Sequence, residues 1–318
     1  MTDSSEEPRQ NFQDRNRVPR EQRRTDMTTI GFVGLGIMGS PMAANLVKAG
    51  YDVVGTNLTQ DKIDLLVQQG GRGAADIAGA VKDADVVITM LPDSPDVDAA
   101  VLGEGGVFEH IRAGALFIDC SSIRPDTSVK VAEAGAAKGV KVVDAPVSGG
   151  EPKAIDGTLS LMVGGEADAF EAAKPILEAV GTTIVHVGPA GSGQTVKIAN
   201  QLIVAGNIGL VAEALIFLEA HGVDTEAGLR ALGGGLAGST VLDAKGDKMR
   251  NREFSPGFRI ELHNKDLGNL EAAARNAGLA LPIGALVTQL IAAANAQGDG
   301  RLDHSGLFKQ IAQLSGRE

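Results

Sequence analysis

The chain has 318 residues, which is enough for two domains of ordinary size. Its formal net charge of −11 argues against a nucleic-acid-binding surface, which needs a basic face, and we count no apolar run long enough to span a membrane. Cys120 is the one cysteine, so the sequence offers neither a disulfide framework nor a cysteine metal cluster, and we expect a protein of the reducing cytoplasm.

Residues 1–26 differ in composition from the rest of the chain. They are rich in Arg, Asp, Glu and Gln, nearly free of large apolar residues, and lack the apolar core of a signal peptide. Because such a segment buries too little apolar surface to offset its ordering entropy, we expect a disordered tail. The folded part is expected to start at Met27.

From Met27 onward, strand-like and helical stretches alternate. Short apolar runs predict strands at residues 30–33, 53–55, 86–90, 116–119 and 142–144, and helices are predicted at 40–49, 60–69, 75–81, 97–101 and 127–138. Near-continuous apolar strands separated by helices are typical of a parallel sheet with both faces covered. Two further runs, 160–164 and 183–186, are expected to extend that sheet, with a helix at 167–180 between them.

The pattern changes after residue 193. Residues 195–221 predict one long helix that is apolar nearly all round, and we therefore expect it to be buried. Further helices are predicted at 226–232, 265–277, 282–296 and 305–314. We expect an α/β domain over residues 27–190 and an all-helical domain over 191–318.

The first predicted strand runs into a glycine turn of the form G-x-G-x-x-G. Gly34 permits the tight turn, Gly36 lets a pyrophosphate approach the backbone, and Gly39 lets the following helix pack closely on the sheet. The N-terminus of that helix offers free N–H groups to phosphates. The sequence predicts a dinucleotide site here, formed by Gly34, Leu35, Gly36, Ile37, Met38 and Gly39.

The second predicted strand is followed by the residues expected to contact the adenosine ribose. An acid at this place is typical of NAD sites, but this segment has none. Asn57 and Thr59 form hydrogen bonds without repelling a 2′-phosphate, and Lys62 is either a phosphate ligand or a solvated helix charge. The pattern leans slightly towards NADP and excludes neither cofactor.

Two more segments end predicted strands at the same edge of the sheet. Met90, Leu91 and Pro92 suit a wall of the cofactor crevice. Ser121 and Ser122 follow the next strand, where their hydroxyls reach either a nicotinamide ribose or a substrate carboxylate, or instead cap the following helix.

A segment rich in small residues follows the strand at 142–144. Consecutive N–H groups of Ser148, Gly149 and Gly150 predict a concavity that binds an anion, such as a small carboxylate; the alternative is a plain turn.

The long helix carries two polar residues near its start, Lys197 and Asn200, which are three apart and share a face. A lysine on an apolar helix is costly unless it is paired or functional, and desolvation lowers its pKa towards the range of a general acid. The alternative is a lysine that snorkels from the first turn. The five histidines show no metal spacing, and we predict no metal site.

Four motifs in this order resemble the β-hydroxyacid dehydrogenases, a family that includes 3-hydroxyisobutyrate dehydrogenase and is related to 6-phosphogluconate dehydrogenase. They are G-F-V-G-L-G-I-M-G at 31–39, D-A-P-V-S-G-G at 144–150, G-S-G-Q-T-V-K-I-A-N at 191–200 and K-D-L at 265–267. The resemblance covers residues 28 to about 314. Leu58 departs from it, because the family usually has an arginine or similar residue there. Residues 149–160, 234–245 and 256–260 look like the tartronate semialdehyde reductase subgroup.

The resemblance implies a Rossmann-type domain followed by an all-helical domain, as in 6-phosphogluconate dehydrogenase. It implies reduction of tartronate semialdehyde to D-glycerate by NAD(P)H, with Lys197 as general acid, Ser122, Ser148, Gly149, Gly150 and Asn200 at the substrate, and Ser122 and Lys265 near the nicotinamide. It further implies a homodimer or homotetramer assembled through the helical domain.

Two alternatives are left open. In the first, the substrate is 3-hydroxyisobutyrate or another short hydroxyacid or semialdehyde. In the second, the chain is a cofactor-binding regulator without turnover. The presence of Lys197 argues against the second, and also against the imine-reducing relatives, which usually replace this lysine.

Overall fold

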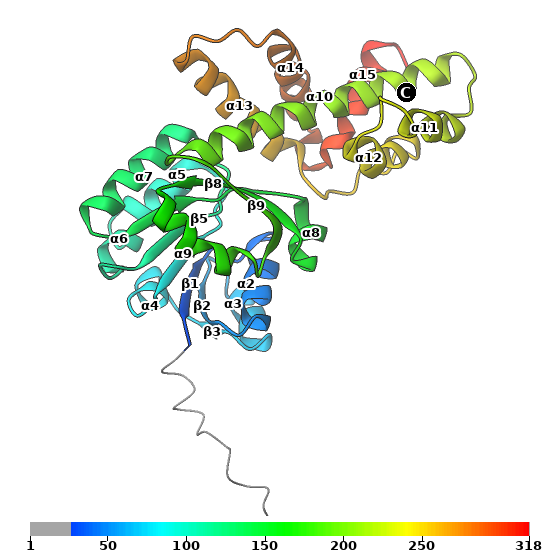
Figure 1. The fold of residues 1–318 in the computed structure, drawn as a ribbon. Helices are drawn as coiled ribbons and strands as arrows, with labels where there is room; N and C mark the ends of the chain where they lie inside the picture. The colour runs from blue at the N-terminus through cyan, green and yellow to red at the C-terminus, as the bar shows by residue number, and fades with distance from the viewer. Residues whose placement is uncertain (1–26, 318) are drawn as a thin grey trace, which may run out of the picture.

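The computed structural model describes residues 27–317 (Figure 1). The tail expected at residues 1–26 lies outside this part of the chain. A sheet-based unit ends with a strand at Gly188, and a long helix that begins at Ser192 carries the remaining helices away from it (Figure 1). The predicted division at residue 190 falls in this short connection and stays a prediction.

Six strands form the parallel part of the sheet, in the order β3-β2-β1-β4-β5-β6. They are β1 (Thr29–Val33), β2 (Asp52–Thr56), β3 (Arg72–Gly73), β4 (Val86–Thr89), β5 (Leu116–Asp119) and β6 (Lys141–Asp144). The strand order reverses between β1 and β4, and ligands of this Rossmann-type arrangement bind outside the carboxyl ends of the strands at that point. The predicted fold class is confirmed.

Beyond β6 the sheet continues with strands that run in the opposite direction. β8 (Leu159–Gly165) is antiparallel to β6, β9 (Gly181–Gly188) is parallel to β8, and the short β7 (Val147–Ser148) is antiparallel to β8. The two runs therefore extend the sheet as expected, and both run opposite to its six parallel strands. The reason lies in β7 and the helix α8 (Gly150–Asp156), which were not predicted and which turn the chain back, so that β8 starts beyond the carboxyl end of β6.

Helices cover both faces of the sheet, which explains the continuous apolar strands. One apolar core joins Ile30 and Phe32 to α2 (Gly39–Lys48), α3 (Gln60–Gln68) and α9 (Ala167–Leu177). The other joins Val87 and Phe117 to α4 (Ile77–Val81), α5 (Ser94–Val97), the π-helical turn η1 (Asp98–Leu102), α6 (Val107–His110) and α7 (Pro125–Ala137). Cys120 is fully buried in the first core, and burial raises the pKa of its thiol.

The helical unit is built on α10 (Ser192–Ala220), which contacts most of the helices that follow. These are α11 (Thr225–Gly233), α12 (Thr240–Arg250), α13 (Ile260–Asn276), α14 (Pro282–Ala296) and α15 (Leu307–Leu314), with short turns η2 (Asp299–Arg301) and η3 (His304–Gly306). The sequence analysis missed α12, because its buried apolar side chains are few and widely spaced. Ser239 caps it by accepting a hydrogen bond from the N–H of Leu242.

Two expectations about the long helix are corrected. By length and composition alone α10 is able to cross a membrane, so the count that found no such run was wrong. Its most apolar window is 44% buried inside the chain. The helix is not buried all round, however, because Ile203, Leu210 and Phe217 are 63–65% exposed.

Candidate functional site

The glycine turn after β1 has a separate structural reason for each glycine. Gly34 has φ +99°, and a Cβ there would lie 2.4 Å from the carbonyl oxygen of Met90. A Cβ on Gly39 would lie 1.9 Å from the carbonyl oxygen of Gly34, whereas a Cβ on Gly36 would meet no heavy atom within 4 Å. Gly36 therefore faces open space at the N-terminus of α2, which is the space that a pyrophosphate needs.

Free donors line this turn. Within residues 27–317, the N–H groups of Gly36, Ile37 and Met38 donate no hydrogen bond. Together with the partial positive charge at the start of α2, they suit a phosphate group. The turn fits a dinucleotide.

Asn57 and Thr59, which follow β2, stabilise the glycine turn through hydrogen bonds. Asn57 Oδ1 accepts the N–H of Leu35 at 3.0 Å, and Asn57 Nδ2 donates to Thr59 Oγ1 at 3.0 Å. Leu58 between them is fully exposed. Lys62 is 43% exposed and lies 3.7 Å from Asp61, which supports the interpretation as a solvated charge. The main contacts of Asn57 are thus within the protein.

Met90, Leu91 and the two serines after β5 meet at the switch point of the sheet. Leu91 donates its N–H to Ser121 Oγ at 2.9 Å, and the Met90 carbonyl packs against Gly34. Neither serine caps α7, since the residue before that helix is Arg124, with no side-chain cap. Met90 and Leu91 therefore lie beside the glycine turn, where a wall of the crevice was predicted, and Pro92 follows them in the chain.

Asp144 turns out to organise the start of α10. Its carboxylate is buried and accepts the N–H groups of Gly191 at 2.8 Å and Gln194 at 2.9 Å. Burial raises the pKa of Asp144, and these hydrogen bonds oppose the rise. Gln194, also buried, accepts from the N–H of Ile123 and donates to the carbonyl of Ser121. Both side chains fix the first turn of α10 against the carboxyl edge of the sheet.

Lys197 lies in the second turn of α10 and is only 7% exposed, so the snorkelling alternative is wrong. Its Nζ donates to Gln201 Oε1 at 3.0 Å, and Gln201 Nε2 donates to Asp266 Oδ2 at 2.5 Å. Burial lowers the pKa of the Lys197 ammonium to about 8, with Asp266 opposing the effect and Lys265 adding to it.

The same array continues in both directions and joins the two units. Asn200 Nδ2 donates to Gln201 Oε1 at 2.8 Å, and Ser148 Oγ donates to Asn200 Oδ1 at 3.3 Å. On the other side, Lys265 lies 2.8 Å from Asp266 and donates to the carbonyl of Ser122 at 2.6 Å. The structure therefore brings Ser122, Ser148, Lys197, Asn200 and Lys265 into one hydrogen-bonded array.

The Ser148–Gly150 segment lies between β7 and α8. Gly149 has φ +137° and Gly150 has φ +69°, which L side chains rarely adopt. Their N–H groups donate no hydrogen bond in the described part of the chain. These features suit an anion-binding concavity at the start of α8.

The sequence analysis assigned no role to two members of the array, Gln201 and Asp266. Gln201 was not singled out, although it is four residues after Lys197 and thus on the same helix face. Asp266 appeared only as part of the K-D-L motif at 265–267, with no role of its own. A buried polar residue on an otherwise apolar face was the available signal for both.

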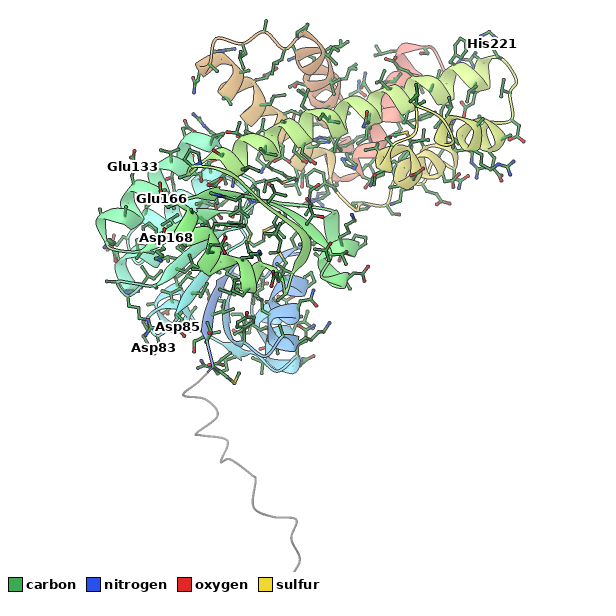
Figure 2. All side chains as sticks on the ribbon, viewed as in Figure 1. Asp83, Asp85, Glu133, Glu166, Asp168 and His221 are labelled. Carbon is green, nitrogen blue, oxygen red and sulfur yellow. The ribbon has the colours of Figure 1, made fainter. Side chains whose placement is uncertain are left out.

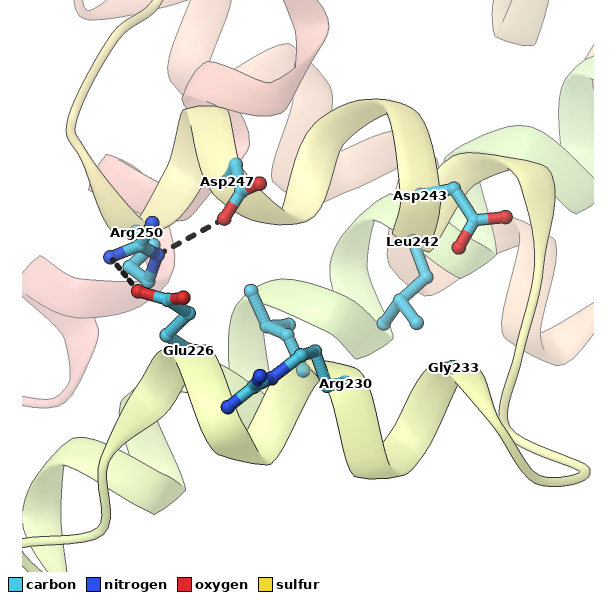
Figure 3. A pocket seen from close by; sticks show the side chains of 8 residues that line it. Glu226, Arg230, Gly233, Leu242, Asp243, Asp247 and Arg250 are labelled. Carbon is cyan, nitrogen blue, oxygen red and sulfur yellow. Dashed lines mark hydrogen bonds and ion pairs between the residues drawn. The ribbon is translucent and has the colours of Figure 1, made fainter.

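Other charged features lie elsewhere. A cavity of about 500 Å³ between α11 and α12 is lined by Glu226, Arg230, Asp247 and Arg250 among others, with Arg250 3.1 Å from Asp247 (Figure 3). Acidic side chains such as Asp85 and Asp168 lie at the outside of the sheet unit, and His221 lies at the far end of α10 (Figure 2). Within residues 27–317 no cluster of His, Cys, Asp and Glu has the composition of a metal site.

Comparison with known proteins gives matches over nearly the whole described chain. Residues 29–188 match the model of the NAD binding domain of 6-phosphogluconate dehydrogenase, and residues 191–311 match that of the NAD-binding domain of NADP-dependent 3-hydroxyisobutyrate dehydrogenase. The 2-hydroxy-3-oxopropionate reductase of Escherichia coli is 41% identical, covering 90% of this chain and 98% of its own.

Two further relatives carry the name 3-hydroxyisobutyrate dehydrogenase. The enzyme of Pseudomonas aeruginosa is 40% identical, covering 91% of this chain and 98% of its own. The solved structure of the Mycobacterium tuberculosis enzyme with L-serine is 33% identical, covers 90% of this chain and 99% of its own, and superimposes with a TM-score of 0.83.

Proposed function

The chain belongs to the family of NAD(P)-dependent β-hydroxyacid dehydrogenases, and we propose that within this family it reduces tartronate semialdehyde (2-hydroxy-3-oxopropionate) to D-glycerate. It is an oxidoreductase, which removes the alternative of a regulator without turnover. The observation that carries the proposal is the array from Ser148 through Lys197 to Ser122, because it would place a carboxylate-binding group beside a general acid.

The proposed cofactor site follows the carboxyl edge of the sheet. Gly34 to Gly39 would hold the pyrophosphate, Met90 to Pro92 would flank the turn, and Asn57 and Thr59 would lie at the adenosine ribose. Ser122 and Lys265 would lie at the nicotinamide end. When bound, NAD(P)H supplies the hydride. The cofactor is NAD(P)H, and the preference between NADH and NADPH is open.

The proposed chemistry uses this array, the N–H groups of Gly149 and Gly150, and the cofactor. Ser148 Oγ and the N–H groups of Gly149 and Gly150 would bind the substrate carboxylate, and Asn200 would orient the carbonyl. The ammonium of Lys197 would give its proton to the carbonyl oxygen as negative charge develops there. Its lowered pKa suits this role near neutral pH, because an acid works best when its pKa is close to the working pH.

The substrate assignment rests on likeness to named relatives and calls for a direct comparison. NADH and NADPH oxidation should be followed with tartronate semialdehyde and methylmalonate semialdehyde, and kcat/KM compared for the four pairs. We expect the higher value with tartronate semialdehyde. A higher value with methylmalonate semialdehyde would instead support the 3-hydroxyisobutyrate alternative, in keeping with the Pseudomonas relative.

Ser148→Ala is expected to raise KM for the semialdehyde by about tenfold or more, since it removes a hydrogen bond to a charged group. KM for the cofactor should change much less. Ser315→Ala is the matched control, because Ser315 follows α15 and its hydroxyl donates to the carbonyl of Ile311, outside the array. Equal changes in the two KM values would argue against a carboxylate site at Ser148.

We also propose that the chain forms a homodimer or homotetramer through the helical unit, and works in the cytoplasm. Val196, Ile203, Leu210 and Phe217 repeat every seven residues along α10, and all four are at least 38% exposed. An exposed apolar stripe with this repeat is typical of a helix that packs against another helix.

Leu210→Glu is expected to reduce the mass in solution to that of the monomer, because it places a charge in the middle of the stripe. Light scattering after size exclusion measures this. Leu58→Glu is the control, since Leu58 is equally apolar but lies fully exposed on the sheet unit. A wild-type protein that is monomeric at micromolar concentration would contradict the proposal.

A further inference from the structure

Two buried histidines lie directly behind the array that holds Lys197. His263 on α13 and His304 in η3 are 0% and 6% exposed, and their Nδ1 atoms are 3.1 Å apart. His263 Nε2 lies 3.1 Å from the main-chain carbonyl oxygen of Gln201. The Phe258 ring stands edge-on to both imidazoles, with centroids 5.7 and 5.4 Å away. The sequence analysis assigned these histidines no role in the reaction.

The hydrogen-bond partners of His263 and His304 determine which ring nitrogen atoms carry protons. A carbonyl oxygen only accepts, so His263 must carry its proton on Nε2. In a neutral His263 the Nδ1 atom is then an acceptor, and His304 must donate from Nδ1. Two neutral imidazoles with these tautomers satisfy both contacts. A further proton on His263 Nδ1 would bring two N–H groups face to face and break the contact.

The surroundings keep the pair neutral. The charged groups that act on His263 are Lys197, Asp266 and Asp303, and those that act on His304 are Asp303, Lys245 and Lys248. Burial is the largest cause that lowers the pKa of both histidines, and the lysines add to it. Asp303 is itself held by Lys245 Nζ at 2.9 Å and by the N–H groups of Gly257 and Phe258.

His263 is placed to control the geometry at Lys197. It precedes Lys265 and Asp266 by less than one helical turn, and it contacts the main chain of Gln201, whose side chain joins Lys197 to Asp266. A shift of α13 along α10 would therefore change the Gln201–Asp266 contact. His304 in turn fixes the ring of His263.

We propose that His263, oriented by His304, is a positioning residue for Lys197 that acts through Gln201 and Asp266. The proposal rests on the proposed role of Lys197 as the acid. His263 does not touch the reacting atoms; it sets the distance between α13 and α10 at the point where the acid is held.

The kinetic test compares His263→Phe with His263→Gln, in which the amide keeps a donor where Nε2 stood. For His263→Phe we expect kcat with tartronate semialdehyde and NADPH or NADH to fall by about 10- to 100-fold, because small displacements of a catalytic group cost this much. The high-pH limb of the reductive kcat/KM profile should move to lower pH, since Asp266 raises the pKa of Lys197 and would lie farther away. His263→Gln should restore most of kcat and the position of the limb.

Two controls separate this proposal from the proposed function. In a Lys197→Ala background, His263→Phe should cause little further loss, because the two residues act on one step. If Lys197→Ala keeps wild-type turnover, the proposed role of Lys197 as the acid is wrong. If Lys197→Ala is inactive, and folded His263→Phe keeps both the wild-type kcat and the wild-type position of the high-pH limb, only the positioning role of His263 is wrong. A loss in His263→Phe without a shifted limb and without rescue by glutamine indicates a merely structural residue and also overturns it.

A spectroscopic measurement needs no turnover. Long-range ¹H–¹⁵N spectra of histidine-labelled wild-type protein at pH 7 should show His263 protonated on Nε2 alone and His304 on Nδ1 alone. A cationic ring, or the reverse tautomers, would overturn the proton arrangement. The same kinetic comparison can be made with His304→Leu and His304→Asn, because His304 contacts His263 rather than Gln201. The test therefore does not depend on the folding of His263→Phe.

Discussion

Replacing Lys197 with alanine is expected to lower kcat by about 10²–10⁴-fold, which is the usual contribution of a positioned acid. Cofactor affinity should stay near that of the wild type, because Lys197 lies in the second turn of α10 and contacts Gln201, not the glycine turn. Steady-state kinetics and a fluorescence titration with NADPH and NADH measure the two effects. Lys62→Ala is the matched control, since Lys62 is an exposed lysine near the cofactor site.

The role of Lys197 as the acid also predicts the direction in which activity changes with pH. With a pKa of about 8, the Lys197 amine is protonated below that pH and neutral above it. Reduction needs the protonated form, so reductive kcat/KM should be flat below about pH 8 and fall above it, while oxidation of the hydroxyacid should show the opposite trend. This limb should be missing from the residual activity of Lys197→Ala. A variant with wild-type kcat and an unchanged limb would rule out Lys197 as the acid.

Alanine at Gly36 and at Gly39 should have opposite consequences, although both glycines belong to one turn. A Cβ at Gly36 meets no heavy atom of the protein, so Gly36→Ala should melt at the wild-type temperature. The same methyl group would occupy the space needed by the pyrophosphate, and cofactor affinity should fall by about tenfold or more, or at least 1.4 kcal/mol.

Gly39→Ala should instead destabilise the fold. Its Cβ would lie 1.9 Å from the Gly34 carbonyl oxygen and 3.2 Å from the Phe32 ring, so α2 must move away from the sheet. Overpacking of this kind costs about 1–3 kcal/mol of unfolding free energy. Thermal melts and NADPH titrations of both variants test the pair. Wild-type affinity in Gly36→Ala would contradict a pyrophosphate at this turn.

The contrast between Gly36 and Gly39 also shows which features a local sequence motif can predict. The spacing of the glycines and the apolar run before them were enough to predict the turn, because a strand, a turn and a helix start are local structures. Their contacts confirm a distinct reason for Gly34 and Gly39. The same holds for most strands of the sheet, whose apolar runs reflect burial on both faces.

Local pattern was less informative where the chain changes direction. Nothing in the residues after Asp144 indicated that β8 would pair antiparallel to β6, because strand direction is decided by how β7 and α8 return the chain. The α12 helix was missed because Gly246 stands between Leu242 and Met249, so the apolar residue one turn from each that marks a helical period is absent. The exposed face of α10 was missed because composition does not say which side of an apolar helix has a neighbour within the same chain.

Local spacing and motifs were enough to predict the fold class, the dinucleotide turn and the candidate residues Ser122, Ser148, Lys197, Asn200 and Lys265. How these residues meet depends on the packing of elements that are distant in the chain. Gln201 and Asp266 connect them across α10 and α13, and His263 and His304 lie behind. Those contacts join residues more than 40 positions apart, and the burial that lowers the pKa of Lys197 exists only once the helices have packed around it.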